Sequence, residues 1–598
     1  MTSTSTTATP PSDAVPRFRR IFTGRAGVII AAAIVGTATG IASILFREAF
    51  AVIQRLAFGA ALAAGTHVAE HAPIWIRLGL PVAGGLAVGL LAWFLLPDRR
   101  PHGVADVIEA GMLRGGAIPL RTGVLAAAAS AVSLGAGASV GREGPMVHLG
   151  ATLGTWLTTR LGLEPRWLRR MLACGAAAGV AASFNAPLAG AIFAAEVVVG
   201  RYTLHTFAPI VIASVAGTIV SRLWYGDAPG FSVPAVTLGS YWEVPVFGLL
   251  GIAAAGAAVL LIRSVGATAA LYQRGHVHPI AQPVIGGLVV GAVAMVLPGV
   301  LGVGYETTSV ALSGTMSIGI ALALTAAKVI ATGASLGSGF GGGIFSPALM
   351  IGATLGSAAG TFALQLFPDA SAGPTAYALV GMGAVAAAVL GAPLSTTLIV
   401  LELTGNYPVT LAVMLATVIA SVLVNEVWGY SFFSWQLKRR GIDPGVRRAD
   451  ALLAEMQLQP LAFDSLAAVE DDVPCRQIAG SERGATERIV VVDAQGNPLG
   501  TVAVLTIRNS AREPDEAPLR LGELERRNDP VVPPGASLAQ ALAALTENPA
   551  PAVLMPDPET PQRFWMIRRD DIMRAYHAIL DRVYAEERGD FRSRSGGE

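Results

Sequence analysis

The residues best suited to chemistry in this chain are single acidic side chains among glycines and prolines, in apolar surroundings. Glu143 lies in residues 141–145 (GREGP), where glycines let the backbone turn and Pro145 suits the first turn of a helix. A helix start presents unpaired N–H groups and partial positive charge, which together bind anions. A carboxylate can occupy that position itself and leave on protonation. The sequence therefore predicts a gate and proton carrier at Glu143; an interfacial glutamate with access to water is the alternative.

The GREGP segment belongs to a longer pattern that occurs twice. Residues 141–145 and 149–154 (LGATLG) are echoed 202 positions later by residues 343–347 (GIFSP) and 351–356 (IGATLG). Duplicated apolar segments interrupted by glycine and proline are typical of transporters and channels whose site lies between two halves. The pattern predicts such a protein.

A second echo, at an offset of 206, involves two further acidic residues. Ala186–Leu188 precedes Glu196 as Ala392–Leu394 precedes Glu402. An ionisable residue inside a membrane segment is a candidate for function. We expect Glu402 to be a structural acid that satisfies nearby helix ends.

The glycine-rich residues 337–343 (GSGFGGG) precede Ile344 and Phe345, whose N–H groups would face a second helix start. A phosphate-binding loop is excluded because no Gly-Lys-Ser/Thr follows and the flanking residues are lipid-like. Glycines that serve only close packing remain the alternative.

Composition places these motifs in a membrane. Of the 598 residues, 53% are hydrophobic and 14% charged, against about 25% charged in soluble domains. Residues 25–435 hold 14 Asp and Glu, whereas the last 163 residues hold 26 of the total 41. A net charge of +1 argues against a nucleic-acid partner. Cys174 and Cys475, the two cysteines, exclude a disulfide framework and a cysteine-based metal site.

The chain reads as a disordered tail (1–20), a membrane domain (21–445) and a soluble domain (446–598). Eleven apolar segments lie between residues 26 and 428, and several are shorter than the ~20 residues of a full crossing. We therefore expect half-helices among them. Segments 171–199 and 376–402 each read as one apolar run. Basic residues before the first segment and after the last favour cytoplasmic termini. We expect the membrane to be the plasma (inner) membrane of a bacterium.

The soluble domain has a different pattern. Segments 488–493 and 499–504 read as strands joined by a turn, and 552–555 and 564–567 as two more. Ser537 is the N-cap of a predicted helix, and another helix begins at Arg569. Two strand–helix units, at about 459–510 and 522–578, resemble a tandem CBS pair.

Several motifs together resemble the CLC family of chloride channels and proton/chloride antiporters. They are residues 141–145 (GREGP), 184–190 (FNAPLAG) and 343–347 (GIFSP), in a consistent order within about 25–440. The resemblance implies an all-α polytopic membrane protein of tilted and broken helices, with a cytoplasmic α/β CBS pair. It further implies two inverted repeats, at about 25–225 and 240–435, and a homodimer with one chloride pathway in each subunit.

The resemblance also assigns roles to single residues. Glu143 becomes the external gate, with Arg142 and Gly144 beside it at the anion path, and the amides of Ile344 and Phe345 line the central anion site. Tyr430, in residues 428–433 (WGYSFF), aligns with a tyrosine whose hydroxyl contacts that anion. The alternative for Tyr430 is an aromatic residue at the membrane interface.

Residues 101–105 (PHGVA) depart from the family's Gly-Ser-Gly-Ile-Pro segment. His102 stands in place of a selectivity serine, followed by Gly103, while Ala105 replaces the usual proline. A neutral histidine can still donate a hydrogen bond to an anion. The alternative is a histidine packed near the inner mouth without contact to the ion.

The position of the family's internal proton relay holds Val197, directly after Glu196. A valine carries no proton, so the resemblance favours a channel; an antiporter that uses Glu196 or another internal route stays open. A CBS-regulated magnesium-type transporter would need clustered carboxylates, and the acids of the apolar region are isolated. No enzyme constellation stands at readable spacing. CBS pairs imply an adenine nucleotide, but no residue identifies its site, and a domain that only steadies the dimer is the alternative.

Overall fold

The chain divides into two compact units, Met1–Pro444 and Gly445–Glu598. The computed structural model describes residues 25–59, 72–163, 167–200, 204–227, 231, 234, 236, 243–369 and 371–442 of the first unit, and 453–454, 456–458, 464–479, 487–512, 519–558, 560 and 562–588 of the second. The predicted disordered tail, 1–20, lies outside these residues.

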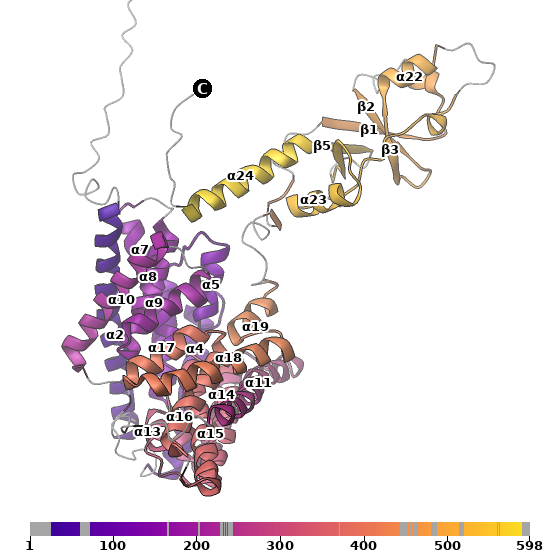
Figure 1. The fold of residues 1–598 in the computed structure, drawn as a ribbon. Helices are drawn as coiled ribbons and strands as arrows, with labels where there is room; N and C mark the ends of the chain where they lie inside the picture. Colours follow the sequence, from indigo (N-terminus) through magenta and orange to yellow (C-terminus); the bar gives the residue numbers. More distant parts are fainter. Residues whose placement is uncertain are drawn as a thin grey trace, which may run out of the picture. The chain divides into compact units, whose positions relative to one another are not determined.

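The described part of the first unit is helical throughout (Figure 1). Its first half contains α2 (Arg25–Phe58), α4 (Ile74–Leu95), α5 (Val104–Met112), α6 (Leu120–Gly135), α7 (Glu143–Arg160), α8 (Leu168–Phe184), α9 (Pro187–Phe193), the π-helix η2 (Ala194–Val199) and α10 (Leu204–Tyr225). Its second half contains α11 (Val244–Arg274), α12 (Ala281–Val296), η4 (Pro298–Val300), α13 (Tyr305–Leu312), α14 (Ile318–Gly337), α15 (Phe345–Leu366), α16 (Gly373–Leu390), α17 (Pro393–Thr404), α18 (Tyr407–Val427) and α19 (Phe432–Arg439).

Among the described residues, eight helices are long and apolar enough to cross a membrane. Four shorter apolar helices of 10–17 residues accompany them. Helices of that length leave backbone ends within the membrane, where only surrounding protein or a water-filled cavity can satisfy them. The expectation of half-helices is confirmed.

The two halves repeat the same helix contacts with their partners exchanged. A Cβ atom added at Gly85, on α4, would lie 2.2 Å from the carbonyl oxygen of Pro283, on α12. One added at Gly287, on α12, would lie 2.2 Å from that of Pro81, on α4. Gly85 and Gly287 are 202 positions apart, as are Pro81 and Pro283, which is the offset of the repeat in the sequence. The equivalent helices of the two repeats therefore pack directly on each other.

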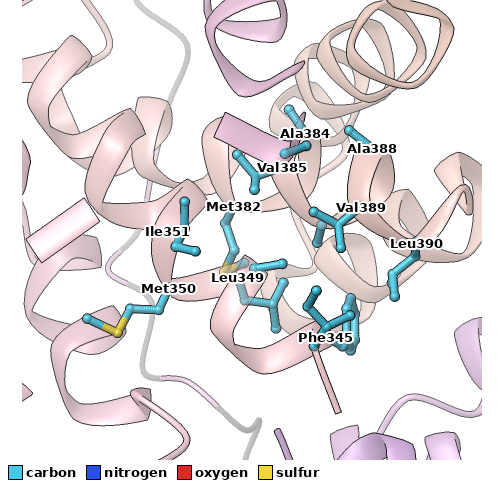
Figure 2. Packing of buried hydrophobic residues seen from close by; sticks show 14 of the residues in the cluster. Phe345, Leu349, Met350, Ile351, Met382, Ala384, Val385, Ala388, Val389 and Leu390 are labelled. Atoms are coloured by element: carbon cyan, nitrogen blue, oxygen red, sulfur yellow. The ribbon is translucent and has the colours of Figure 1, made fainter. Parts of the chain in front are cut away.

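In the second repeat, α15, which starts within residues 343–347 (GIFSP), packs on α16, the next helix along the chain. Figure 2 shows side chains of α15, such as Leu349 and Ile351, packed beside side chains of α16, such as Met382, Val385 and Val389. The labelled side chains are apolar and buried. This core fixes the start of α15 in place.

Segments 171–199 and 376–402, expected as single apolar runs, are each broken. Asn185 and Gly391 have φ angles of +60° and +71°, which end α8 and α16. Pro187 and Pro393 then begin new helices, because proline suits a first turn but cannot continue a helix. Each of these apolar runs therefore contains two helices, and each break creates a helix start inside the unit.

The second unit holds one five-stranded sheet of order β3-β2-β1-β5-β4. Its elements are β1 (Asp464–Glu470), α21 (Cys475–Ala479), β2 (Arg488–Val492), β3 (Pro498–Ala503), α22 (Val504–Ser510), η6 (Leu521–Glu523), α23 (Leu538–Glu547), β4 (Ala552–Pro556), β5 (Arg563–Arg568) and α24 (Arg569–Arg588). The four predicted strands, the helix capped by Ser537 and the helix from Arg569 are confirmed; β1 is an addition.

The sheet joins the two predicted strand–helix units. β1 pairs in parallel with β2 of its own unit and antiparallel with β5 of the other. Two isolated bridges repeat this pattern from the side of the second strand–helix unit: Val531 pairs in parallel with Leu554, on β4 of its own unit, and Arg527 pairs antiparallel with Thr501, on β3 of the other unit. The region is therefore consistent with a CBS pair.

Candidate functional site

The two motif helices of the repeats start against each other. The amide of Gly141 donates to the carbonyl of Gly343 at 2.6 Å, and the amide of Gly343 donates to the carbonyl of Gly141 at 2.7 Å. This antiparallel bridge lies just before α7 and α15. Two positive helix ends are thereby brought to one place, which is the arrangement that binds an anion.

Only glycine fits where these helix starts touch. A Cβ atom at Gly144 would lie 2.8 Å from the Cα of Gly343, and one at Gly343 would lie 2.8 Å from the amide nitrogen of Gly144. Both contacts are to backbone, which cannot rotate away. The glycines of the motifs are therefore explained by close approach and by exposure of amides together.

Glu143 is the first residue of α7 and is buried, with 3% of its surface exposed. Its Oε1 accepts hydrogen bonds from the hydroxyl of Ser346, on α15, and from the hydroxyl of Tyr305, on α13, at 3.2 Å. Its Oε2 has no hydrogen-bond partner among the described residues. The carboxylate is thus held by neutral hydroxyls, and one of its oxygens is unpartnered.

Arg142 lies beside this carboxylate but is directed elsewhere. Its Nε is 3.8 Å from Oε1 of Glu143, beyond hydrogen-bond distance, and its Nη2 donates to the carbonyl of Ser183 at 2.7 Å. The guanidinium carbon stands 4.7 Å from the centre of the Tyr305 ring. Arg142 therefore supplies positive charge near the Glu143 carboxylate without a direct hydrogen bond to it.

Two cavities lie next to these residues, and we call them inner and outer after the two sides of the membrane predicted from the sequence. The inner cavity, of about 270 Å³, includes His102, Glu143 and Phe345 in its lining, together with Arg440 near the end of the unit. The outer cavity, of about 230 Å³, includes Arg47, Arg55, Arg142 and Tyr305. Since Tyr305 lines one cavity and bonds to Glu143, which lines the other, the carboxylate stands between them.

The predicted central amides reach the inner cavity. Ile344 and Phe345 line it beside Gly144 and Gly343. The first four N–H groups of a helix have no partner within the helix, and within the described part of the chain the amides of Ile344 and Phe345 donate no hydrogen bond. These amides can therefore bind an anion in the cavity.

His102 and Gly103 also line the inner cavity, but the Gly103 amide is already used. It donates to Oδ2 of Asp106 at 2.8 Å. Asp106 is bound in turn by Arg100 at 2.6 Å and by Arg440 at 3.0 Å. Burial opposes ionisation of Asp106, yet its bonds to arginine hold its pKa well below the usual range. An anion predicted at Gly103 would compete with this carboxylate.

Tyr430 does not join the other predicted residues. Its hydroxyl accepts a hydrogen bond from Lys438, whose ammonium lies 4.2 Å from the ring centre. Among the described residues, the inner cavity is lined near this point by Phe432 and Phe433 and not by Tyr430. The anion contact predicted for the Tyr430 hydroxyl stays a prediction, and in this structure that hydroxyl is bound to Lys438.

Glu196 and Glu402 cap helices of the opposite repeat. The carboxylate of Glu402 accepts from the amides of Leu188 at 2.9 Å and Ala189 at 2.8 Å, at the start of α9. Glu196 accepts from the amides of Leu394 at 3.1 Å and Ser395 at 2.9 Å, at the start of α17. The structural role expected of Glu402 is confirmed. Glu196, a predicted proton-pathway candidate, has the same capping role.

Two residues that bind the Glu143 carboxylate were not predicted. Ser346 lies inside the GIFSP motif and could have been found, because a hydroxyl at a helix start is a ready donor. Tyr305 contacts Glu143 across 162 positions of sequence and carries no local motif. Among the described residues, no group of three or more His, Cys, Asp or Glu side chains could hold a metal ion.

Comparison with known proteins agrees with this geometry. Residues 84–425 match the family described as "Voltage gated chloride channel". A ClcB-like protein of Ralstonia nicotianae is 36% identical over 418 residues, which cover 69% of this chain and 97% of that protein. A slow cyanobacterial Cl⁻/H⁺ antiporter of known structure matches with a TM-score of 0.61 and 25% identity, over 70% of this chain and 98% of that one.

A eukaryotic CLC transporter of known structure matches over more of the chain. Its TM-score is 0.57 at 19% identity, and the match covers 91% of this chain and 97% of that one. A likeness at this identity concerns the fold. The coverage extends beyond the helical unit into residues of the second unit.

Proposed function

Because the chain belongs to the voltage-gated chloride channel family, we propose that it moves chloride through a pathway in each subunit, with the Glu143 carboxylate as the gate. The observation that carries the proposal is the position of Glu143. It lies at the meeting point of two helix starts and separates the inner cavity from the outer cavity.

The amides of Ile344 and Phe345 support an anion as the transported ion. They bind negative charge without a full positive charge, so the ion is stabilised and can still leave. Three arginines (Arg47, Arg55 and Arg142) and two glutamates (Glu48 and Glu306) line the outer cavity, so that its lining carries a net positive charge that attracts anions. Chloride is the ion that fits the family.

The gate works through competition between two negative groups. While Glu143 is ionised, its carboxylate accepts the hydroxyls of Ser346 and Tyr305 and repels an approaching chloride. Protonation removes that charge and weakens both bonds. The side chain is then free to leave the path, and chloride can pass from one cavity to the other.

The mode of transport has two candidates. Val197 stands where an internal proton relay is expected, and the neighbouring Glu196 is bound to the start of α17, which together favour passive conduction. Proton/chloride exchange by another route is favoured by His102, an ionisable side chain that lines the same cavity as Glu143. Both modes share the anion path and the gate.

Other parts of the proposal rest on the resemblance alone. They are a homodimer, cytoplasmic termini in a bacterial inner membrane, and an adenine nucleotide at the second unit. Mass photometry of the detergent-solubilised protein tests the dimer. Calorimetric titration with ATP and AMP tests the nucleotide.

The decisive experiment uses purified protein in liposomes with a chloride gradient set against a proton gradient. The reversal potential is recorded for the native chain and for Glu143→Ala. A potential at the chloride equilibrium value indicates a channel, and one displaced by the proton gradient indicates an antiporter. Loss of pH-dependent gating in Glu143→Ala supports the gate. Absence of chloride flux in the native chain would refute the proposed function.

A further inference from the structure

Two histidines stand together at the inner cavity, and the proposed mechanism does not yet use them. His102 precedes α5 and His148 lies on α7, five positions after Glu143. Their ring centres are 5.5 Å apart and their planes are inclined by 27°. Both side chains are buried, with 8% and 1% of their surface exposed.

The hydrogen bonds of His102 identify the nitrogen that can take up a proton. Its Nε2 lies 3.1 Å from Oδ2 of Asp98, and an ionised carboxylate only accepts hydrogen bonds. Nε2 therefore carries the hydrogen of the neutral ring. Nδ1 is then the acceptor, and it is buried without a hydrogen-bond partner in the described part of the chain.

The fixed charges around His102 are balanced. Arg100 bonds to Asp106 at 2.6 Å and lies 3.8 Å from Asp98. Arg440 is shared between Asp106 and Glu109, at 3.0 and 2.9 Å. Glu109 is also paired with Arg114. Three arginines are thus paired with three carboxylates, so their charges cancel. A change of charge at this end of the inner cavity therefore has to come from the two histidines.

The cluster lies on the side of the membrane from which the chain enters. α2 and α4 are both long enough to cross, so the end of α4 returns to the side of Arg25. Asp98 and His102 follow that end directly. The basic N-terminal residues predict this side to be cytoplasmic. Asp98, whose side chain is 50% exposed, holds the Nε2 edge of the buried imidazole and leaves Nδ1 as the nitrogen that can take up a proton.

We propose that His102 is the cytoplasmic proton-binding site of the transport cycle, in the role that Val197 cannot fill. This inference rests on the proposed function, with Glu143 as the gate. His102 and Glu143 line one cavity of about 270 Å³, which has room for several water molecules. Protons can therefore pass between them without a continuous chain of side chains.

The proton transfer balances simply. Nδ1 of His102 takes a proton from the cytoplasm and the ring becomes imidazolium, stabilised by Asp98. The imidazolium then gives that proton, through cavity water, to the Glu143 carboxylate. Neutral imidazole and a carboxylic acid result, and no other bond changes. The negative charge of a chloride bound at the amides of Ile344 and Phe345 stabilises the positive imidazolium of His102. Binding of the anion therefore promotes binding of the proton.

His148 positions the site and limits its charge. Two imidazolium rings 5.5 Å apart would repel each other, so the pair holds one proton at a time. Protons therefore enter singly, which suits exchange against an anion.

The test measures chloride efflux and chloride-driven proton uptake in the same liposomes. His102→Gln keeps a hydrogen-bond donor but no longer binds a proton, and His102→Asn is a second variant. We expect the number of protons moved per chloride to fall at least tenfold, a ratio that is independent of any change in the rate of chloride efflux itself. Val197→Glu, added to His102→Gln, is expected to restore proton movement.

His276→Asn is the matched control, because His276 is exposed and lies outside both cavities. Its φ of +48° is one that asparagine tolerates. A native proton-to-chloride ratio in both His102 variants would overturn the proposal. Chloride efflux without proton movement in the native chain would also overturn this proposal, but it would leave the proposed function, chloride transport, intact. Absence of chloride efflux in the native chain would instead refute the proposed function.

Discussion

Removal of the Ser346 hydroxyl is expected to loosen the gate. Oε1 of Glu143 accepts hydrogen bonds from Ser346 and Tyr305, and Oε2 accepts none among the described residues. A hydrogen bond to a charged group contributes about 1.5–3 kcal/mol. Ser346→Ala removes one of the two, and each 1.4 kcal/mol is a factor of ten. The fraction of open gates should therefore rise by about 10- to 150-fold when Glu143 is ionised.

Chloride efflux from liposomes measures this effect at two values of pH. At high pH, where the carboxylate is charged, Ser346→Ala should release chloride faster than the native chain, up to the rate of Glu143→Ala. At low pH, protonation has already freed the gate, so the two rates should converge. A pH-independent change would mean that the substitution acts on the path and not on the gate.

Ser357→Ala provides the matched control. Ser357 lies on the same helix as Ser346, is fully buried, and its Oγ has no hydrogen-bond partner among the described residues. Ser357→Ala removes the same hydroxyl group from the same helix but breaks no hydrogen bond to Glu143. Efflux from Ser346→Ala equal to the native rate at high pH, or an equal increase in Ser357→Ala, would refute the reasoning.

Three further substitutions test the framework. Gly343→Ala places a Cβ atom 2.8 Å from the Gly144 amide nitrogen, so we expect a destabilisation of about 1–3 kcal/mol and at least a tenfold loss of chloride efflux. Glu402→Ala leaves two amides at the start of α9 without their cap and should lower the free energy of unfolding by about 0.5–2 kcal/mol, measured by thermal denaturation against the exposed Glu426→Ala. Asp529→Ala removes a buried carboxylate bound to Thr501 and Arg527, and should destabilise the second unit by about 3 kcal/mol in urea while efflux is unchanged.

Sequence reasoning succeeded where the signal is local. The strands of the second unit other than β1 were predicted because each contains a short run of large apolar residues close to turn residues, and the cap at Ser537 is predicted by the residues next to it. β1 (Asp464–Glu470) was missed because its sequence, DSLAAVE, has no such run: acidic residues stand at both ends and two alanines in the middle. Its place between β2 and β5 comes from tertiary pairing, which overrides its weak intrinsic preference.

The same limit applies to the site. Glu143, Ile344 and Phe345 are marked by glycine and proline beside them, and all three reach the inner cavity. The ion pair of Arg440 with Asp106 joins positions 334 residues apart and has no sequence signal. Tyr430 was carried over from a motif resemblance, which carries no information on side-chain direction; Phe432 and Phe433, at the start of α19 (Phe432–Arg439), line the cavity instead.

The bonds between the two halves bear on how transport can occur. A rotation of one half against the other would break both backbone bonds between Gly141 and Gly343, and would also separate Glu196 and Glu402 from the helix starts they cap. Capping bonds of this kind each contribute about 0.5–2 kcal/mol, and their amides would be left unpaired inside the membrane. Rotation of the Glu143 side chain breaks two hydrogen bonds and leaves the backbone intact. The smaller motion therefore has the lower barrier, which favours the proposed gate, a single side chain, over a movement of the two halves that these bonds join.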